Sequence, residues 1–133
     1  MYKSISIKKF IPGIIWFIIV LILICLPGKV FPIVKPWFEE LDFDKIIHIT
    51  MFGILNLLFV SPLFKSDLDL SNKKKSILFI TLFFIGWGFI TECIQLFVPK
   101  RSFDLLDWLA DSIGILIVYW FYSKKINRLV VTL

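Results

Sequence analysis

Four long apolar segments, joined by short polar connections, constrain the fold of this chain more than any other feature. They cover residues 10–26, 44–64, 76–98 and 105–122. Each is close to the roughly 20 residues that a helix needs to cross about 30 Å of hydrocarbon. The whole chain has only 133 residues, 59% of them apolar, and a soluble domain of that size buries only about 60–70% of its surface. We therefore predict an all-α, polytopic membrane protein: a compact bundle of four transmembrane helices that forms a single domain over residues 1–133.

Basic residues flank these segments unevenly. Ten of the 15 Lys and Arg residues lie before the first segment, between the second and third, or after the fourth: Lys3, Lys8, Lys9, Lys65, Lys73, Lys74, Lys75, Lys124, Lys125 and Arg128. Basic residues near helix ends mark the cytoplasmic side. Both termini are therefore predicted to be cytoplasmic, and the loops 27–43 and 99–104 to face outward. The lysines form no basic face interleaved with aromatics, which argues against nucleic acid as a partner.

Two features within the apolar segments bear on structure rather than chemistry. Cys25 and Cys93 lie in different segments without a CxxC partner, so neither a disulfide framework nor a thiolate metal site is supported. Asn56 lies near the middle of the second segment, where an interhelical hydrogen bond is expected.

Ionisable residues within membrane segments are costly and mark candidate functional sites. Asp44 and His48 open the second segment four residues apart, so they share one helix face, with His48 roughly 6 Å deeper. A hydrogen-bonded packing role is the alternative for His48.

The third segment carries Glu92 and Gln95 near its end, one helical turn apart. Gly88 precedes Glu92 by four residues, so the same face can approach another helix closely. A carboxylate at this depth has to pair with a cation, share a proton or bind a metal ion.

Three aspartates follow the turn into the fourth segment. Asp104, Asp107 and Asp111 are spaced by three and four residues, which places them on one stripe of a helix. Asp104 is also suited to capping that helix. Lys100 and Arg101 just before it could neutralise these acids, so a purely structural set of ion pairs is the alternative to a functional site.

The depths of these residues agree. His48, Glu92 and Asp111 each lie about one to two turns below the predicted outer surface, on three different segments. This agreement predicts a shared, outward-facing polar pocket.

The same residues carry a family resemblance. Residues 44–48, DKIIH, followed by Phe52, resemble the DKxxH signature of the VanZ-like membrane proteins. Residues 92–107, with Glu92, Gln95 and then PKRSFDLLD, resemble that family's ExxQ…PxRxxDxxD region. Ala110 and Gly114 match its AN-x-x-G continuation, and the resemblance covers residues 41–119. One position departs, because Asp111 stands where the family usually has asparagine; the substitution adds a group that can carry charge, strengthen metal affinity or demand protonation.

The resemblance implies a role in the cell envelope. The family is named for an accessory protein linked to teicoplanin resistance. The outward-facing polar pocket predicted above suits membrane lipids, a lipid-linked cell-wall precursor or a lipophilic glycopeptide as partners in such a role.

Two functions remain open on the sequence. The first is a module that binds a lipid headgroup, an envelope precursor or a glycopeptide in the outward pocket. The second is an intramembrane enzyme that acts on a phosphate- or ester-containing lipid, with or without a divalent metal ion. In the enzyme, His48 would transfer protons, Glu92 would be a metal ligand or base, and Arg101 would bind phosphate. A purely structural role for the polar residues is a third, weaker alternative, because interhelical hydrogen bonds contribute only about 0.6 kcal/mol each.

The candidate residues fall into three sets. The catalytic candidates are His48, Glu92 and Asp107. The ligand-binding candidates are Asp44, Gln95, Arg101, Ser102, Asp104 and Asp111. The candidate metal ligands are His48, Glu92, Asp107 and Asp111.

Overall fold

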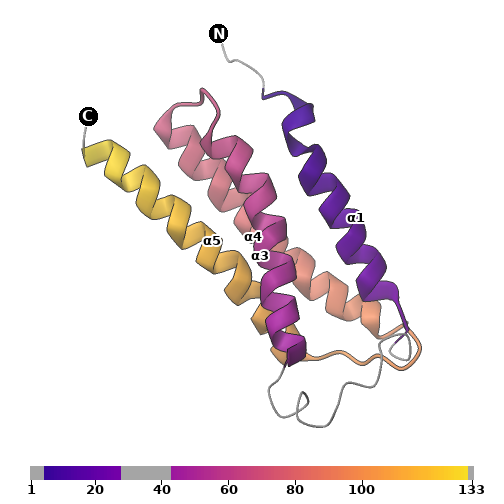
Figure 1. Ribbon diagram of the computed structural model, residues 1–133. Helices are drawn as coiled ribbons and strands as arrows, with labels where there is room; N and C mark the ends of the chain where they lie inside the picture. The colour runs from indigo at the N-terminus through magenta and orange to yellow at the C-terminus, as the bar shows by residue number, and fades with distance from the viewer. Residues whose placement is uncertain (1–4, 28–42, 132–133) are drawn as a thin grey trace.

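All regular secondary structure is helical over the residues that the computed structural model describes, 5–27 and 43–131 (Figure 1). A short 3-10 helix and four α-helices follow one another: η1 (Ile7–Phe10), α1 (Ile11–Cys25), α3 (Phe43–Phe64), α4 (Leu70–Gln95) and α5 (Leu105–Val131). The all-α prediction is confirmed. Most of the loop predicted to face outward, residues 28–42, lies outside the described part of the chain.

Within the described ranges, four helical segments are long and apolar enough to cross a membrane: Ile7–Cys25, Phe43–Phe64, Leu70–Gln95 and Leu105–Leu129. Large apolar side chains such as Phe79, Leu82 and Ile117 are exposed on the bundle surface. Soluble monomers rarely expose contiguous apolar surface on this scale, whereas hydrocarbon solvates it. The chain is therefore a multi-pass membrane protein, as the apolar segments predicted.

The helices run alternately up and down, so each end of the bundle collects particular parts of the chain. The described N-terminal and C-terminal ends lie with the α3–α4 turn at one end of the bundle, which we call the terminal end (Figure 1). The starts of α3 and α5 and the end of α4 lie at the opposite end, which we call the site end (Figure 1). Residues far apart in sequence, near positions 48, 92 and 111, are thereby brought to similar depths.

Two helices differ in length from the predicted spans. α4 begins at Leu70, ahead of the predicted residue 76, because the Asp69 carboxylate caps it by accepting a 3.1 Å hydrogen bond from the Asn72 N–H. That hydrogen bond also holds the pKa of Asp69 below its ordinary value. α5 continues to Val131, past the predicted residue 122. Hydropathy locates the part of a helix that lies in hydrocarbon, and both helices continue beyond it through residues that water can solvate.

The end of α4 also differs from the prediction. The helix stops at Gln95 rather than at residue 98, and residues 96–104 form the turn into α5. Lys100 in this turn adopts a left-handed conformation with φ of 62°, directly after Pro99. The apolar residues 96–98 looked like helix because side-chain hydropathy does not report a backbone turn.

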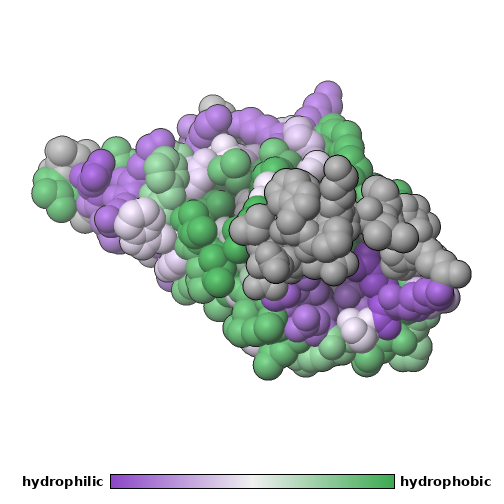
Figure 2. All heavy atoms as spheres, turned by 60° about the horizontal axis from the view of Figure 1, so that its bottom comes forward, coloured by the Kyte–Doolittle hydropathy of each residue, from purple (hydrophilic) through white to green (hydrophobic). Residues whose placement is uncertain are grey.

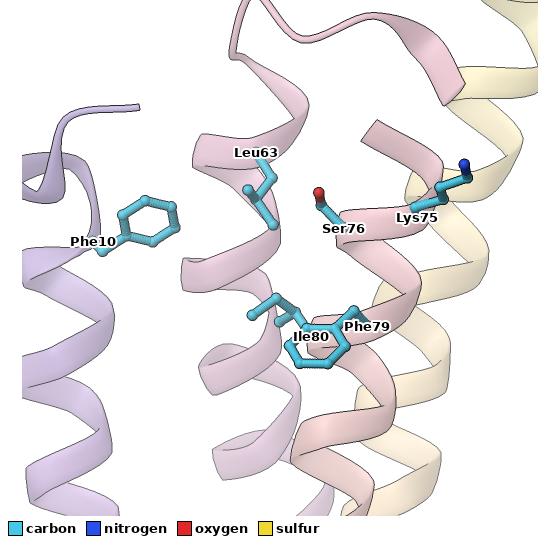
Figure 3. Close-up of a pocket in the computed structure, with 6 residues that line it drawn as sticks. All are labelled: Phe10, Leu63, Lys75, Ser76, Phe79 and Ile80. Atoms are coloured by element: carbon cyan, nitrogen blue, oxygen red, sulfur yellow. The ribbon is translucent and has the colours of Figure 1, made fainter. Parts of the chain in front are cut away.

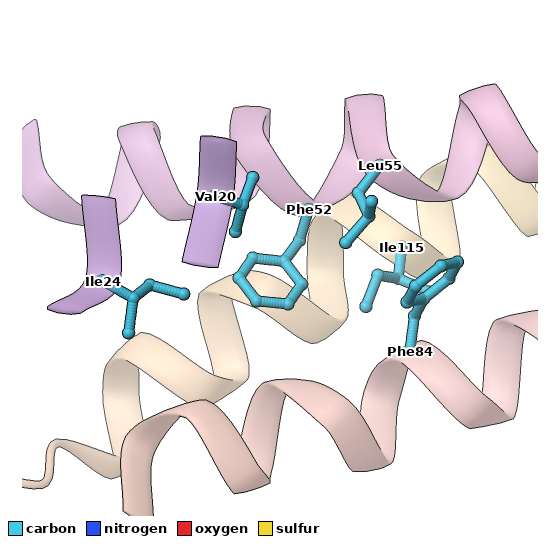
Figure 4. Close-up of a cluster of buried hydrophobic side chains, with 6 residues drawn as sticks. All are labelled: Val20, Ile24, Phe52, Leu55, Phe84 and Ile115. Atoms are coloured by element: carbon cyan, nitrogen blue, oxygen red, sulfur yellow. The ribbon is translucent and has the colours of Figure 1, made fainter. Parts of the chain in front are cut away.

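The bundle core contains side chains from all four α-helices. Val20 and Ile24 of α1, Phe52 and Leu55 of α3, Phe84 of α4 and Ile115 of α5 form one buried cluster (Figure 4). A second cluster nearer the terminal end consists of Val60, Leu63, Ile77, Tyr122 and Ile126. These contacts fix the rotation of each helix, and hence the faces that meet at the site end.

The backbones of α3 and α5 approach one another closely beside the site. A Cβ atom on Gly114 would collide with the carbonyl oxygen of Ile49 and would lie 3.0 Å from the Gly53 nitrogen. Only glycine permits such a contact, as small residues do generally between membrane helices. One turn further along, Asn56 Nδ2 donates a 3.0 Å hydrogen bond to the Ile115 carbonyl, which confirms the predicted interhelical bond.

Candidate functional site

His48 of α3 and Asp111 of α5 lie in contact beside the close approach of these two helices. His48 Nδ1 lies 2.9 Å from Asp111 Oδ1. Asp111 is 0% exposed and His48 is 9% exposed. An ionised carboxylate only accepts hydrogen bonds, so Nδ1 carries the donated proton when Asp111 is ionised. The contact joins two predicted site residues across 63 positions of sequence.

A set of less buried charges adjoins this pair toward the site end. Asp107, one turn before Asp111, has Oδ2 3.8 Å from His48 Nε2 and Oδ1 3.5 Å from Lys45 Nζ. Lys45 Nζ also lies 3.2 Å from the exposed carboxylate of Asp44. The imidazole of His48 therefore lies between two aspartates of α5, one deep and one near the surface.

Glu92 of α4 is completely buried and has two differently placed oxygens. Its Oε2 accepts a 3.1 Å hydrogen bond from the Asp104 backbone N–H. The Asp104 side chain accepts a 2.8 Å hydrogen bond from the Leu106 N–H, which caps α5 as predicted. Glu92 therefore attaches the end of α4 to the start of α5 through one oxygen. Among the described residues, its other oxygen, Oε1, has no hydrogen-bond partner.

His48, Glu92 and Asp111, which we call the buried trio, lie close enough to share one ligand. Each offers a nitrogen or oxygen atom, and these three atoms lie within 4.8 Å of one another. Asp111 Oδ2, like Glu92 Oε1, is buried and has no hydrogen-bond partner within the described part of the chain. Asp107 lies beside the trio rather than within it, so the structure separates one of the four candidate metal ligands from the other three.

Small and aromatic residues shape the α4–α5 side of the trio. A Cβ atom on Gly88 would lie 3.2 Å from Asp111 Oδ2, so the absence of a side chain there gives the carboxylate its space. The Trp108 indole Nε1 donates a 3.0 Å hydrogen bond to the Ile85 carbonyl, which ties α5 to α4. Gly88 thus has the close-approach role that its position before Glu92 predicted.

The remaining candidate residues surround the trio at different depths. Gln95 is buried one turn after Glu92, and Ser102 is exposed in the α4–α5 turn. Arg101 is half-buried, and its Nε donates a 3.5 Å hydrogen bond to the Leu26 carbonyl at the end of α1. Roles in ligand binding for these residues stay predictions.

Lys45 was missed as a site residue although it belongs to the DKxxH signature. Its contact with Asp107 links α3 to α5 beside the buried groups, on the side of the site end. The signal was available, because Lys45 precedes His48 by three residues and so shares its helix face. The sequence could not show that the face of α3 carrying Lys45 and His48 is turned toward Asp107 of α5.

A hollow of about 400 Å³ lies in another part of the molecule. It is lined by Phe10, Leu63, Lys75, Ser76, Phe79 and Ile80, near the terminal end (Figure 3). None of the predicted site residues lines it. The predicted pocket around the buried trio therefore stays a prediction, and the trio itself is enclosed.

The fold and the site together define a multi-pass α-helical membrane protein with ionisable groups of three helices buried together near one end of the bundle. The family model described as VanZ/LLP1 matches residues 6–128, and the chain belongs to this family. The resemblance carried by residues 41–119 is thereby confirmed, and the match extends over α1. No curated protein and no solved structure matches the chain.

Proposed function

We propose that this chain is a cell-envelope membrane protein that binds the polar headgroup of a phosphate-bearing lipid, free or lipid-linked, at the outer face of the membrane. The observation that carries the proposal is the convergence of His48, Glu92 and Asp111 from three helices at one depth. Buried ionisable groups are costly in a membrane protein and are retained where they serve a function. The modest stabilisation from interhelical polar contacts, about 0.6 kcal/mol each, argues against a purely structural set.

The distribution of charge supports an outward-facing site. Basic residues gather at the terminal end, in η1, the start of α4 and the end of α5: Lys8, Lys9, Lys73, Lys74, Lys75, Lys124, Lys125 and Arg128. The positive-inside rule assigns that end to the cytoplasm. The site end then faces outward. In a view turned toward it, hydrophilic surface lies beside the grey residues and hydrophobic surface along the flanks (Figure 2).

The charges near the trio favour a headgroup that has both phosphate and a positive group. Lys45 and Arg101, both partly exposed, supply cationic groups of the kind that bind phosphate oxygens. Asp107 and the buried trio behind them favour a cation, either an amine of the headgroup or a metal ion that bridges to its phosphate. A glycopeptide such as teicoplanin, which the family name suggests, would have to use the same acidic groups.

A binding experiment with matched variants tests the headgroup proposal. The protein is placed in nanodiscs and titrated with short-chain phosphatidylethanolamine, phosphatidylglycerol and teicoplanin in separate arms. We expect saturable binding of a phospholipid by the natural chain and at least about tenfold weaker binding by Glu92→Gln, which keeps size but removes the charge. Asp69→Asn, at the terminal end, is the control and should bind normally. Equal binding by Glu92→Gln, or saturation only by teicoplanin, would contradict the proposal.

Cysteine labelling tests the orientation separately. In a background with Cys25→Ser and Cys93→Ser, Ser102→Cys should react with a membrane-impermeant maleimide on intact cells. Lys125→Cys should react only after the membrane is opened. The reverse pattern would place the site in the cytoplasm.

An enzyme that hydrolyses a phosphate- or ester-containing lipid is the second candidate. One observation favours it: His48 Nε2, the ring nitrogen away from Asp111, lies 3.8 Å from Asp107, nearer the surface. An imidazole held between two carboxylates is suited to proton transfer near neutral pH. Release of phosphate or fatty acid from phosphatidylethanolamine vesicles by the natural chain, lost in His48→Gln, would support this function. The absence of release with Zn²⁺ or Mn²⁺ supplied would exclude it for that lipid.

A further inference from the structure

We propose that the buried trio is a binding site for one divalent transition-metal ion, with His48, Glu92 and Asp111 as its protein ligands. The three ligand atoms lie within 4.8 Å of one another and come from three helices, α3, α4 and α5. This proposal concerns the ion alone and does not depend on which lipid the protein binds.

The first argument is the unsatisfied bonding capacity of the trio. Glu92 Oε1 and Asp111 Oδ2 are buried on residues that are 0% exposed, and neither has a hydrogen-bond partner among the described residues. An unsatisfied buried polar atom costs about 1–3 kcal/mol, and more when the group is charged. In the trio, Glu92 and Asp111 each have one such atom. A metal ion would satisfy them together.

The second argument is charge. Two enclosed carboxylates carry a charge of −2 when ionised, and His48 can offset only one unit within the trio. Asp107 adds another carboxylate 3.8 Å from the imidazole, and Lys45 lies on its outer side. Buried like charges without a counter-charge are strongly unfavourable. A divalent cation would neutralise both carboxylates of the trio while leaving the imidazole uncharged, as a ligand nitrogen has to be.

The third argument is the chemistry of the donors. One imidazole nitrogen with two carboxylate oxygens suits Zn²⁺, Mn²⁺ or Fe²⁺. Ca²⁺ takes about six to eight oxygens, and thiolate-preferring ions need sulfur, so both fit poorly. Three protein ligands also leave coordination positions for water or a headgroup oxygen.

The competing explanation is a shared proton. His48 and Asp111 at 2.9 Å could hold one proton between them, with Glu92 also protonated. That state would remove most of the charge without a metal ion. The two explanations differ in what the natural chain binds, which a measurement on the purified protein decides.

The experiment uses the full chain in detergent, purified without a polyhistidine tag, stripped with a chelator and titrated separately with Zn²⁺, Mn²⁺, Mg²⁺ and Ca²⁺. Calorimetry gives the affinity, and elemental analysis after desalting gives the stoichiometry. We expect one equivalent of Zn²⁺ or Mn²⁺ per chain and at least about 100-fold weaker binding of Ca²⁺. Because His48 is the single histidine, ¹⁵N-histidine labelling should show its ring nitrogens shifting as Zn²⁺ is added.

Two variants of the trio and one control variant make the result specific. Asp111→Asn and Glu92→Gln should each weaken binding by at least about 100-fold, more than the 10–100-fold effect of changing residues that only orient a ligand. Asp69→Asn, the same chemical change at the terminal end, should leave the affinity unchanged. The natural chain failing to bind any of these ions saturably would overturn the proposal without reference to a variant. The proposal would also be overturned if Asp111→Asn and Glu92→Gln bound the ion as tightly as the natural chain. It would likewise be overturned if the ¹⁵N signals of His48 did not change on addition of Zn²⁺. Lipid binding that persists without metal would leave the headgroup proposal standing.

Discussion

Gly114 sets the distance between α3 and α5, so Gly114→Ala should both destabilise the bundle and disrupt the buried trio. An alanine Cβ would collide with the Ile49 carbonyl oxygen and would lie 2.9 Å from the Ile49 carbonyl carbon. The second contact alone is 0.5 Å shorter than the 3.4 Å at which ordinary contact begins. Both partners are backbone atoms of a helix, so a side-chain rotation cannot relieve the overlap. The two helices have to move apart.

The loss of stability in Gly114→Ala follows from this separation of α3 and α5. Overpacking in a close-packed interior destabilises by about 1–3 kcal/mol. His48 directly precedes Ile49, and Asp111 is one turn before Gly114, so their contact lies beside the overlap. Moving the helices apart by 0.5 Å would lengthen the His48–Asp111 distance from 2.9 Å toward 3.4 Å, past the roughly 3.2 Å limit of an N–H···O bond.

Unfolding in a denaturing-detergent titration measures the first effect, and the ring-nitrogen spectrum of His48 measures the second. Two alanine variants serve as controls. Gly53→Ala would meet the Gly114 carbonyl oxygen at an ordinary 3.4 Å, and Gly86→Ala would meet nothing within 4 Å. Neither should lose more than about 0.5 kcal/mol, since alanine is otherwise the better helix former by about 1 kcal/mol. A Gly114→Ala protein as stable as Gly86→Ala, with an unchanged His48 signal, would refute this account of the α3–α5 contact.

Two further substitutions probe the surroundings of the trio. Gly88→Ala would place a Cβ 3.2 Å from Asp111 Oδ2. Changes next to a metal ligand weaken binding, so we expect the affinity for Zn²⁺ or Mn²⁺ to fall by about tenfold. Gly86→Ala is the control and should leave the affinity unchanged in the same calorimetric titration. Equal affinities in the two variants would show that the space beside Asp111 does not matter. Lys45→Met removes a cation that lies 3.5 Å from Asp107, so we expect divalent ions to bind about two- to fivefold more tightly. The free energy of unfolding should change by less than about 1 kcal/mol, because the Lys45–Asp107 ion pair is partly exposed. Weaker ion binding in that variant would mean that Lys45 supports the site rather than opposing the ion.

The spans and the polar residues could be read from sequence because both depend on local properties. Twenty or so apolar residues in a row require a membrane, whatever their neighbours are. His48, Glu92 and Asp111 stood out because each is costly where it lies. Their common depth followed from counting residues along three consecutive segments that cross the membrane in alternating directions.

The pairing of these groups could not be read in the same way, because it depends on how each helix is rotated and how closely two helices approach. The 2.9 Å contact of His48 with Asp111 lies beside the close approach of the two helix backbones at Gly114, and the closeness of that approach appears only in three dimensions. The same holds for Lys45, whose partner Asp107 lies on another helix. The end of α4 at Gln95 was missed because residues 96–98 are apolar, and hydropathy does not report where the backbone leaves the helix.

The magnetic resonance signal of His48 tests the central claim most directly, because the chain has no other histidine. The measurement compares the ¹⁵N-labelled imidazole in the natural chain with that in Glu92→Gln and Asp111→Asn, each confirmed to be folded. If side chains of α3, α4 and α5 share one buried centre, both substitutions on the other helices change the ring-nitrogen shifts of His48, and Asp69→Asn does not. An imidazole spectrum that stays the same in Glu92→Gln and Asp111→Asn would mean that the three helices do not bring these groups together.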